Sequence, residues 1–384
     1  MISNYDFLLF ENFYRAINHN KDVDIIAKFL KKLNYTVAIL DVCPINNYRF
    51  EMGIPVLKTK HQYNPIKGRV RFIPSRVANI LDDLRWNWHL HKVLKEYKGK
   101  YKHLYVGSYY TKMIPFWFFD IPKTSSVFFW GLRSFWLQEY KYGVSLRGIN
   151  SFFLSRMVKY CKNLKFFVSD DNIKSEFIDL GISPNRLVLR YERYIDEMPP
   201  VRNVLNNKCS FLSIGSLRRD KRIEMIVSAF DGISEPYRYY IAGRAEGDYD
   251  KVIQNAINGN SNIVRNGNRL TEEEFNDLMD NSDYLVLCDV RPPSCVTNGT
   301  MNEALLKGIP IIAPNYNPYM SVIEKYHVGI MFDPNIEGSL HEALEKAART
   351  SSRSFRNGIE KYQQTLLFDR VLSAFNQDIK LSLS

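Results

Sequence analysis

Hydrophobic and polar positions follow two different periods along the chain, and this predicts strands that alternate with helices. Short apolar runs at 5–10, 35–42 and 165–169 have the length and the aromatic or β-branched content of buried strands. Between such runs, 77–98 carries apolar residues at helical spacing. This alternation is typical of a parallel, doubly wound α/β sheet.

The pattern stops once and then resumes. Segment 196–207 holds two consecutive prolines in a polar run, which is typical of a linker, and 384 residues favour two domains. We expect a Rossmann-like domain at 1–198, a second at 199–365, and a C-terminal helix at 366–384 that packs back on the first. A cleft between two such domains is the usual place for a substrate.

The sequence NEALLKGIPIIAP, residues 302–314, predicts a short helix followed at once by a buried strand. In an open α/β sheet the N-terminus of such a helix lies at the carboxyl edge of the strands, where ligands bind. Its unpaired N–H groups and positive dipole suit a phosphate. Glu303 near the helix start is then placed to bind ribose hydroxyls. The alternative interpretation is an ordinary surface helix with a solvated glutamate.

The net charge of +11 is unevenly distributed. Residues 1–200 hold 31 Lys and Arg against 18 Asp and Glu, whereas residues 201–384 hold 21 against 23. The excess in the first half indicates an anionic partner, such as a lipid surface or a pyrophosphate-linked acceptor. A basic surface that serves only solubility is the alternative. A nucleic-acid partner is disfavoured, because no RNA- or DNA-binding motif accompanies the charge.

The remaining sequence features limit the cofactors and the location. The five cysteines show no CxxC spacing, which argues against zinc and fits reduced thiols in a cytosol. The N-terminus lacks the pattern of a signal peptide, and the longest apolar runs are about ten residues, against the roughly 20 that span a bilayer. No clear DxD triplet follows a strand, so no metal or other cofactor is expected. We expect a cytoplasmic protein, either free or peripheral on the inner face of the cell membrane.

Four segments of the second half form an ordered set. They are FLSIGSLRRDKRIEMIVSAF (211–230), YYIAGRAEG (239–247), RLTEEEFNDLMDNSDYLVL (269–287) and PPSCVTNGTMNEALLKGIPIIA (292–313). In this order they resemble the GT-B glycosyltransferases, specifically the large retaining group that uses nucleotide-diphosphate sugars (glycosyltransferase family 4, or glycosyl transferases group 1). In the first half, only 163–190 resembles this family. The resemblance implies an α/β fold with two doubly wound Rossmann-like domains facing a cleft.

The resemblance also implies roles for individual residues. Lys221 matches a family lysine that, with an arginine, stabilises the charge on the leaving phosphate. The position of that arginine is Ser216 here, and Arg218 and Arg219 are the candidate replacements. Glu303 matches the glutamate that binds the ribose. The other nucleotide-binding candidates are Gly215, Ser216, Gly243, Arg244, Asn298, Gly299 and Thr300, with Gly299 expected to permit close approach of the backbone.

The chain departs from the family pattern at the donor sugar. The family has a second glutamate eight residues before the first, and that position is Cys295, or Thr297 in another alignment. Asp289 and Arg291 are the nearest candidates for the sugar contact. The glycine-rich loop after the first strand is replaced by 11–20, which contains no glycine.

An aromatic segment lies in the first half, where residues 101–153 hold 17 of the 53 Phe, Tyr and Trp. Trp130, Arg133 and Trp136 combine rings with positive charge, which suits a membrane interface or stacking on an acceptor sugar. Packing in the core is the alternative.

The predicted function is transfer of a sugar from a UDP- or GDP-sugar to a saccharide or lipid-linked saccharide acceptor in bacterial glycan assembly, with retention of configuration. If the reaction instead inverts, Asp120, Glu139 and His103 are candidate bases. Two alternatives stay open. One is a GT-B enzyme that does not transfer, such as a nucleotide-sugar epimerase or hydrolase. The other is a catalytically silent partner of another transferase.

Overall fold

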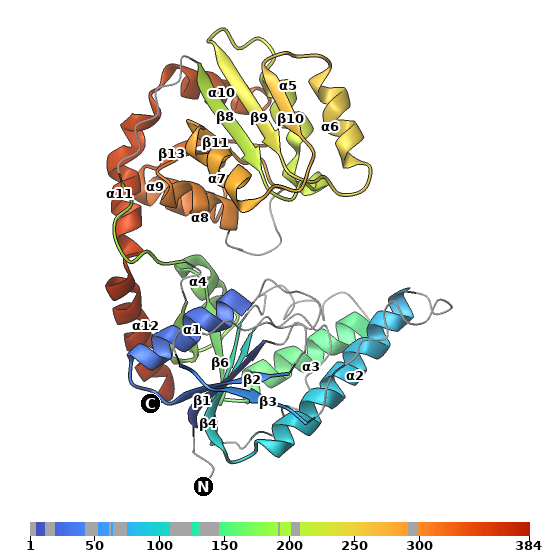
Figure 1. The fold of residues 1–384 in the computed structure, drawn as a ribbon, viewed down its shortest axis with the longest axis vertical. Coiled ribbons are helices and arrows are strands. Elements are labelled where there is room, and N and C mark those ends of the chain that lie inside the picture. The colour runs from blue at the N-terminus through green and yellow to red at the C-terminus, as the bar shows by residue number, and fades with distance from the viewer. Residues whose placement is uncertain are drawn as a thin grey trace. The chain divides into compact units, whose positions relative to one another are not determined.

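The computed structural model describes residues 5–11, 20–42, 53–60, 63, 75–107, 118, 121, 124–130, 146–190, 193–200, 208–290 and 298–384. The chain divides into two units (Figure 1). Unit 1 comprises 1–192 together with 372–384, and unit 2 comprises 193–371. Each unit is built around a parallel sheet with helices on its faces.

The described sheet of unit 1 has the strand order β3-β2-β1-β4-β5-β6-β7, and every pairing is parallel. Its strands are β1 (Tyr5–Glu11), β2 (Val37–Asp41), β3 (Val56–Lys58), β4 (Tyr101–Gly107), β5 (Val127–Phe129), β6 (Leu164–Val168) and β7 (Leu187–Leu189). Its helices are α1 (Asn20–Lys32), α2 (Ser75–Glu96), α3 (Leu146–Tyr160) and α4 (Asp171–Asp179), with a 3₁₀ turn at Pro184–Arg186.

The two faces of this sheet are covered by different helices. Buried residues of α2 and α3 pack in one cluster with Leu8, Phe10 and their neighbours on the adjacent strands. Phe7, one residue along β1, points to the opposite face, because successive side chains of a strand alternate. The doubly wound arrangement predicted from the alternation of strands and helices is therefore confirmed (Figure 1).

The C-terminal helix α12 (Phe368–Leu383) is present, and its later residues belong to unit 1. The Phe375 ring lies 5.3 Å from that of Phe29 on α1 and stacks on Phe167 of β6 at 5.9 Å. The Asp378 carboxylate accepts a hydrogen bond of 2.8 Å from the Leu189 amide at the end of β7. These contacts fix the end of the chain to the face of the sheet that α1 covers.

The described sheet of unit 2 has the order β10-β9-β8-β11-β12-β13, again wholly parallel. Its strands are β8 (Cys209–Ile214), β9 (Tyr237–Ala242), β10 (Ile263–Asn266), β11 (Tyr284–Val286), β12 (Ile311–Pro314) and β13 (Gly329–Phe332). Its helices are α5 (Ile223–Ala229), α6 (Tyr249–Ile257), α7 (Glu272–Asp280), α8 (Gly299–Leu306), α9 (Tyr319–Tyr326), α10 (Ser339–Arg349) and α11 (Arg356–Thr365). Short 3₁₀ turns precede α5 at Arg219–Lys221 and α11 at Ser352–Phe355.

The structure departs from the sequence-based expectation at the boundary between the units. The division falls before Arg193 and not after Met198, because Ile195 pairs with the segment that enters α12. The Ile195 amide donates to the Leu366 carbonyl at 2.9 Å, and the Phe368 amide donates back to the Ile195 carbonyl at 2.8 Å. The sequence pattern also gave no indication of β3 or α11.

Candidate active site

Two glycine turns at the carboxyl edge of the unit 2 sheet lie against each other. Gly215 follows β8 with φ of +114°, and Gly243 follows β9 with φ of +118°, both values that favour glycine. A Cβ atom on Gly243 would lie 2.0 Å from the Gly215 carbonyl oxygen. The Leu217 amide donates to the Arg244 carbonyl at 3.0 Å. Both glycines are therefore required for the two turns to run side by side.

The N-terminus of α8 lies beside the first of these turns. The Asn298 side chain caps the helix, since its Oδ1 accepts from the Met301 amide at 3.0 Å. Thr300 Oγ1 is 3.8 Å from the position that a Cβ atom on Gly215 would take. The structure thus brings predicted site residues from β8, β9 and α8 to one edge of the sheet, as the resemblance implied.

Gly299 is the first residue of α8, which begins three residues earlier than the pattern of apolar residues suggested, and its φ does not lie in the left-handed region. A Cβ atom there would meet no heavy atom of the protein within 4 Å. Packing within the protein therefore does not require a glycine at this position. The expected approach of a ligand to the Gly299 backbone stays a prediction.

Lys221, the predicted catalytic cation, is paired with Asp289. Its Nζ lies 2.5 Å from Asp289 Oδ1, and the two side chains are only 20% and 12% exposed. The other carboxylate oxygen of Asp289 accepts from Asn298 Nδ2 at 3.3 Å and from the Tyr319 hydroxyl. One carboxylate therefore joins the basic loop after β8 to the N-cap of α8. Because Asp289 follows β11, whose neighbours are β8 and β12, it lies near the centre of the carboxyl edge.

Two tyrosines support Asp289 from one segment, and no sequence motif indicates either of them. The Tyr316 hydroxyl donates to the Asp289 backbone carbonyl. Tyr319 begins α9 and bonds both to the Asp289 carboxylate and to Asn298 Nδ2, the latter at 2.8 Å. Burial raises the pKa of Tyr319, and the negative charge of Asp289 raises it further. Tyr319 therefore keeps its proton and acts as a donor to Asp289.

Arg218 and Arg219 make separate ion pairs. Arg218 holds Asp220 through two hydrogen bonds of 3.1 and 2.9 Å. This hydrogen-bonded pairing raises the pKa of Arg218, against the effect of burial. Arg219 pairs with Asp248 at 2.8 Å, and its guanidinium lies over the Tyr249 ring on α6. Of the three basic candidates, Lys221 is the one that contacts the Asp289 cluster directly.

Glu303 lies one turn into α8, as predicted, and its carboxylate is already engaged. Its Oε1 accepts from Arg193 Nε at 2.9 Å, and its side chain is about one-third exposed. Arg193 precedes the strand-like pairing at Ile195 within the same unit. A ribose that bound Glu303 would therefore share or displace this arginine.

The structure describes some of the remaining site candidates of unit 2 and leaves others outside the described residues. Ser216 and Arg244 are exposed on the two glycine turns. Arg291, Cys295 and Thr297 lie outside the described residues. Asp289, a candidate contact for the donor sugar, pairs with Lys221 in the structure, and its contact with a sugar stays a prediction.

In unit 1, Trp130 directly follows β5 and is half-buried. The guanidinium of buried Arg190 lies 3.9 Å from the centre of the Trp130 ring. Arg133, Trp136, Asp120 and Glu139 lie outside the described residues. His103 lies within β4, four residues before its carboxyl end, with its ring 5.0 Å from that of Phe7. That position does not suit a base at the carboxyl edge of the sheet.

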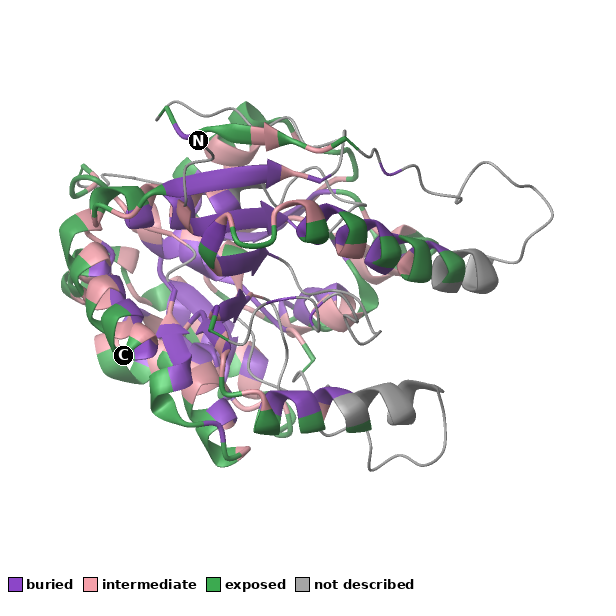
Figure 2. Ribbon diagram, turned by 90° about the horizontal axis from the view of Figure 1, so that it is seen from below, coloured by how far each residue is buried: buried purple, intermediate pink, exposed green. Residues whose placement is uncertain are grey.

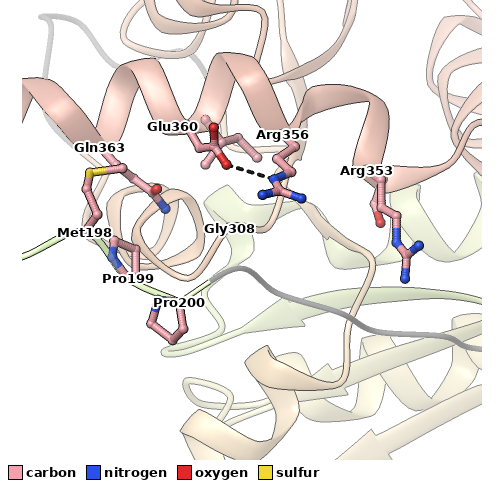
Figure 3. Close-up of a pocket in the computed structure, with 10 residues that line it drawn as sticks. Met198, Pro199, Pro200, Gly308, Arg353, Arg356, Glu360 and Gln363 are labelled. Carbon is pink, nitrogen blue, oxygen red and sulfur yellow. Dashed lines mark hydrogen bonds and ion pairs between the residues drawn. The ribbon is translucent and has the colours of Figure 1, made fainter.

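A cavity of about 290 Å³ lies in unit 2 next to Gly308, which follows the C-terminal end of α8 (Figure 3). It is lined by Met198 and Pro199 from one segment and by residues of α11, among which Arg356 pairs with Glu360 at 2.8 Å. The site residues at Asn298 and Thr300 lie at the other end of α8. This cavity is therefore separate from the candidate active site.

Comparisons with known proteins agree with this geometry. The family described as Glycosyl transferases group 1 matches residues 195–365, which hold all the predicted unit 2 site residues. No protein of curated function matches the sequence significantly.

Solved structures resemble the whole chain at low sequence identity. The lipopolysaccharide outer core galactosyltransferase WaaB has a TM-score of 0.66 and 12% identity, over 97% of this chain and 99% of its own. Sucrose-phosphate synthase from Thermosynechococcus elongatus has a TM-score of 0.66 and 13% identity, over 97% of this chain and 98% of its own. Anabaena HepE, solved with UDP, has a TM-score of 0.63 and 13% identity, over 98% of this chain and 99% of its own. Residues 195–365 therefore form a domain of the Glycosyl transferases group 1 type, and the two parallel-sheet units give the chain the GT-B fold.

Proposed function

We propose that the chain transfers a hexose from a UDP- or GDP-sugar to a saccharide or lipid-linked saccharide acceptor in bacterial glycan assembly. The observation that carries this proposal is the link from Lys221 through Asp289 to Asn298, which gathers a cation and a helix N-terminus at one edge of a sheet. An ammonium group and free helix N–H groups are the groups that bind a diphosphate. HepE, which has the same fold, was solved with UDP and with UDP-glucose.

In the proposed reaction, the leaving nucleoside diphosphate gains negative charge as the bond to the sugar breaks. Lys221 and the N-terminal amides of α8 stabilise that charge, with Arg218 and Arg219 contributing from the same loop. Glu303 accepts hydrogen bonds from the ribose hydroxyls. We assign the charge stabilisation to these protein groups, without a metal ion.

Retention of configuration is part of the proposal and rests on the family resemblance alone. In such a reaction the leaving phosphate assists the incoming hydroxyl, so that no protein base is needed. We place the enzyme at the inner face of the cell membrane, where a lipid-linked acceptor would be presented. Within the described part of the chain, no helix is long and apolar enough to cross a bilayer.

A thermal-shift screen with UDP, GDP and their common sugar conjugates tests the proposal. Mass action predicts a rise in melting temperature with one nucleoside diphosphate, since binding to the folded state alone stabilises it. A sugar conjugate that binds should then release its nucleoside diphosphate when an acceptor saccharide is added. If a sugar conjugate binds but no acceptor saccharide causes release of its nucleoside diphosphate, the enzyme does not transfer the sugar. If no nucleotide or sugar conjugate changes the melting temperature, the proposed donor site is wrong.

A further inference from the structure

The exposed residues among the described side chains of α2 in unit 1 are all apolar or basic, and its acidic residues Asp83 and Glu96 are half-buried. Over 81–96, where its side chains are described, the exposed positions follow one helical stripe. Trp88 is 54% exposed and is flanked by the ammonium of Lys92, 5.9 Å from the ring centre. The exposed residues are Leu81, Leu84, Arg85, Trp88, Lys92 and Lys95.

Helix α3 repeats this composition. Its exposed side chains, among those described, are Phe152, Arg156, Lys159 and Tyr160. The Arg156 guanidinium lies 4.9 Å from the centre of the Phe152 ring and 6.0 Å from that of Tyr160, which is 63% exposed. An arginine between two exposed rings keeps its charge at the surface next to apolar area.

The two helices cover the same face of the unit 1 sheet. The crossovers from β3 to β4 and from β5 to β6 run in the same direction along the sheet, and right-handed crossovers then place both helices on one side. Their buried residues confirm this, since Trp86 and Leu90 of α2 share one core cluster with Leu154 and Met157 of α3. The buried and exposed stripes along the helices are visible in Figure 2.

Among the described side chains, no other helix exposes both large apolar and basic residues without also exposing acidic ones. The exposed side chains of α7 in unit 2 are all acidic: Glu272, Glu273, Glu274, Asp277 and Asp280. Helix α4, in unit 1, exposes Asp171 and Asp179. The apolar and basic faces of α2 and α3 are therefore a local feature, and they lie in the half of the chain that carries the excess positive charge.

We infer that the outward faces of α2 and α3 form a docking surface for an anionic lipid bilayer. Basic side chains bind anionic headgroups, while exposed leucine and aromatic side chains enter the interface. The expected surface around Trp130 stays a prediction, because the Trp130 ring is half-buried against Arg190 and Arg133 and Trp136 lie outside the described residues. The inference deepens the proposed function and rests on its claim that the acceptor is presented at a membrane.

Vesicle flotation with the full chain tests this inference. The vesicles contain phosphatidylcholine with about 30% phosphatidylglycerol, or phosphatidylcholine alone as the neutral reference. The charge variant is K92E/K95E/R156E, and the apolar variant is W88Q/F152Q. All five side chains are exposed, so the fold should tolerate both changes. The matched controls are K31E/K32E on α1, which covers the other face of the sheet, and M225Q/I336Q in unit 2.

The native chain should float with the anionic vesicles at low salt and be released at high salt. Both surface variants should lose about tenfold or more of that binding, and both controls should keep it. No binding of the native chain, or equal loss in K31E/K32E, would overturn the inference. Binding to single-stranded RNA is measured for the same chains. If the two surface variants lose RNA binding but keep vesicle binding, the surface belongs to a nucleic-acid site, and this result would also overturn the inference.

A parallel readout separates this inference from the donor site. The nucleoside diphosphate that stabilises the native chain should stabilise both surface variants equally, because α2 and α3 belong to the other unit. If the native chain responds to nucleotide but does not bind vesicles, the docking surface fails and the donor site stands. If the chain binds vesicles through α2 and α3 but no nucleotide stabilises it, the donor site fails instead.

Discussion

Lys221 Nζ lies 2.5 Å from Asp289 Oδ1, and both side chains are largely buried. The Asp289 carboxylate also accepts a hydrogen bond from Asn298, the N-cap of α8. Asp289 therefore positions both the Lys221 ammonium and the start of α8. A ligand-free site arranged in this way has its positive charge already neutralised. A bound diphosphate would replace Asp289 as the partner of Lys221 or share the lysine with it.

Lys221→Met should weaken nucleoside diphosphate binding by about tenfold or more, because a hydrogen bond to a charged group contributes about 1.5–3 kcal/mol. Binding of the uncharged nucleoside should change little. Calorimetric titration of both ligands measures the difference. Lys307→Met is the matched control, since Lys307 is 25% exposed and pairs with Asp280 at 2.8 Å beyond the opposite end of α8. Equal weakening in both variants would contradict the assignment.

Asp289→Asn should destabilise the ligand-free chain by about 1–3 kcal/mol, since it leaves a largely buried ammonium without its counter-charge. A nucleoside diphosphate supplies that charge, so it should raise the melting temperature of Asp289→Asn more than that of the native chain. Tyr319→Phe is the control, because it removes a hydrogen bond to Asp289 but keeps the carboxylate. A smaller rise in Asp289→Asn than in the native chain would show that the carboxylate supports nucleotide binding and does not compete with it.

Two glycines at the site should respond in opposite ways to alanine. Gly243→Ala places a Cβ 2.0 Å from the Gly215 carbonyl oxygen at a φ of +118°. We expect it to lower the free energy of unfolding of unit 2 by about 3 kcal/mol or more. Gly299→Ala meets no atom within 4 Å and should be neutral or stabilising by up to about 1 kcal/mol. Denaturant titration of the two variants measures both effects, and tolerance of Gly243→Ala would refute the described packing of the turns.

His103 should make the stability of unit 1 depend on pH. Burial lowers the pKa of His103 from 6.5 to about 4, with Lys102 adding to the effect and Asp6 opposing it. Between these values the unfolded chain binds a proton that the folded chain does not, so stability falls as the pH drops from about 6.5 towards 4. After allowance for partial exposure, we expect a loss of about 1–2 kcal/mol.

His103→Phe keeps a ring against Phe7 and Phe128 and removes the titrating group. Denaturant titrations between pH 7 and pH 4 should therefore show a flatter dependence in this variant. An unchanged slope would assign the pH dependence to other groups. Asp6 contributes mainly below about pH 4, because its pKa is held at about 2, against the effect of burial, by hydrogen bonds from Lys102 and Thr36.

Most of the fold could be predicted from the sequence, because the strands are short apolar runs and the helices have clear apolar faces. Thr271 and Glu274 have the spacing of a capping box, and the structure has this box at the start of α7. Strand β3, at the edge of the sheet, was missed because its three residues are not buried. Helix α11 was missed because its polar sequence RNGIEKYQQT shows only two apolar side chains, Ile359 and Tyr362, towards the core.

The main residues of the candidate site could be predicted from the sequence, but the residues that they contact could not. Lys221 and Glu303 were identified by resemblance, but their partners Asp289 and Arg193 are distant in sequence. Nothing in the local sequence indicates that Tyr319 would reach Asp289, since the contact depends on where the fold places the start of α9 relative to Asp289 and Asn298. The position of Asp289 directly after a buried strand was the available signal, and it was interpreted as a contact for the sugar.

Calorimetric titration of UDP and GDP into the native chain and into Glu303→Ala measures whether a nucleotide binds at the start of α8. We expect one of the two nucleotides to bind the native chain, and Glu303→Ala to weaken this binding by about tenfold or more while the fold is kept. Glu324→Ala, an exposed glutamate on the neighbouring helix α9, should leave the affinity unchanged. Binding of neither nucleotide, or equal affinity in the native chain and Glu303→Ala, would contradict a donor site at the N-terminus of α8.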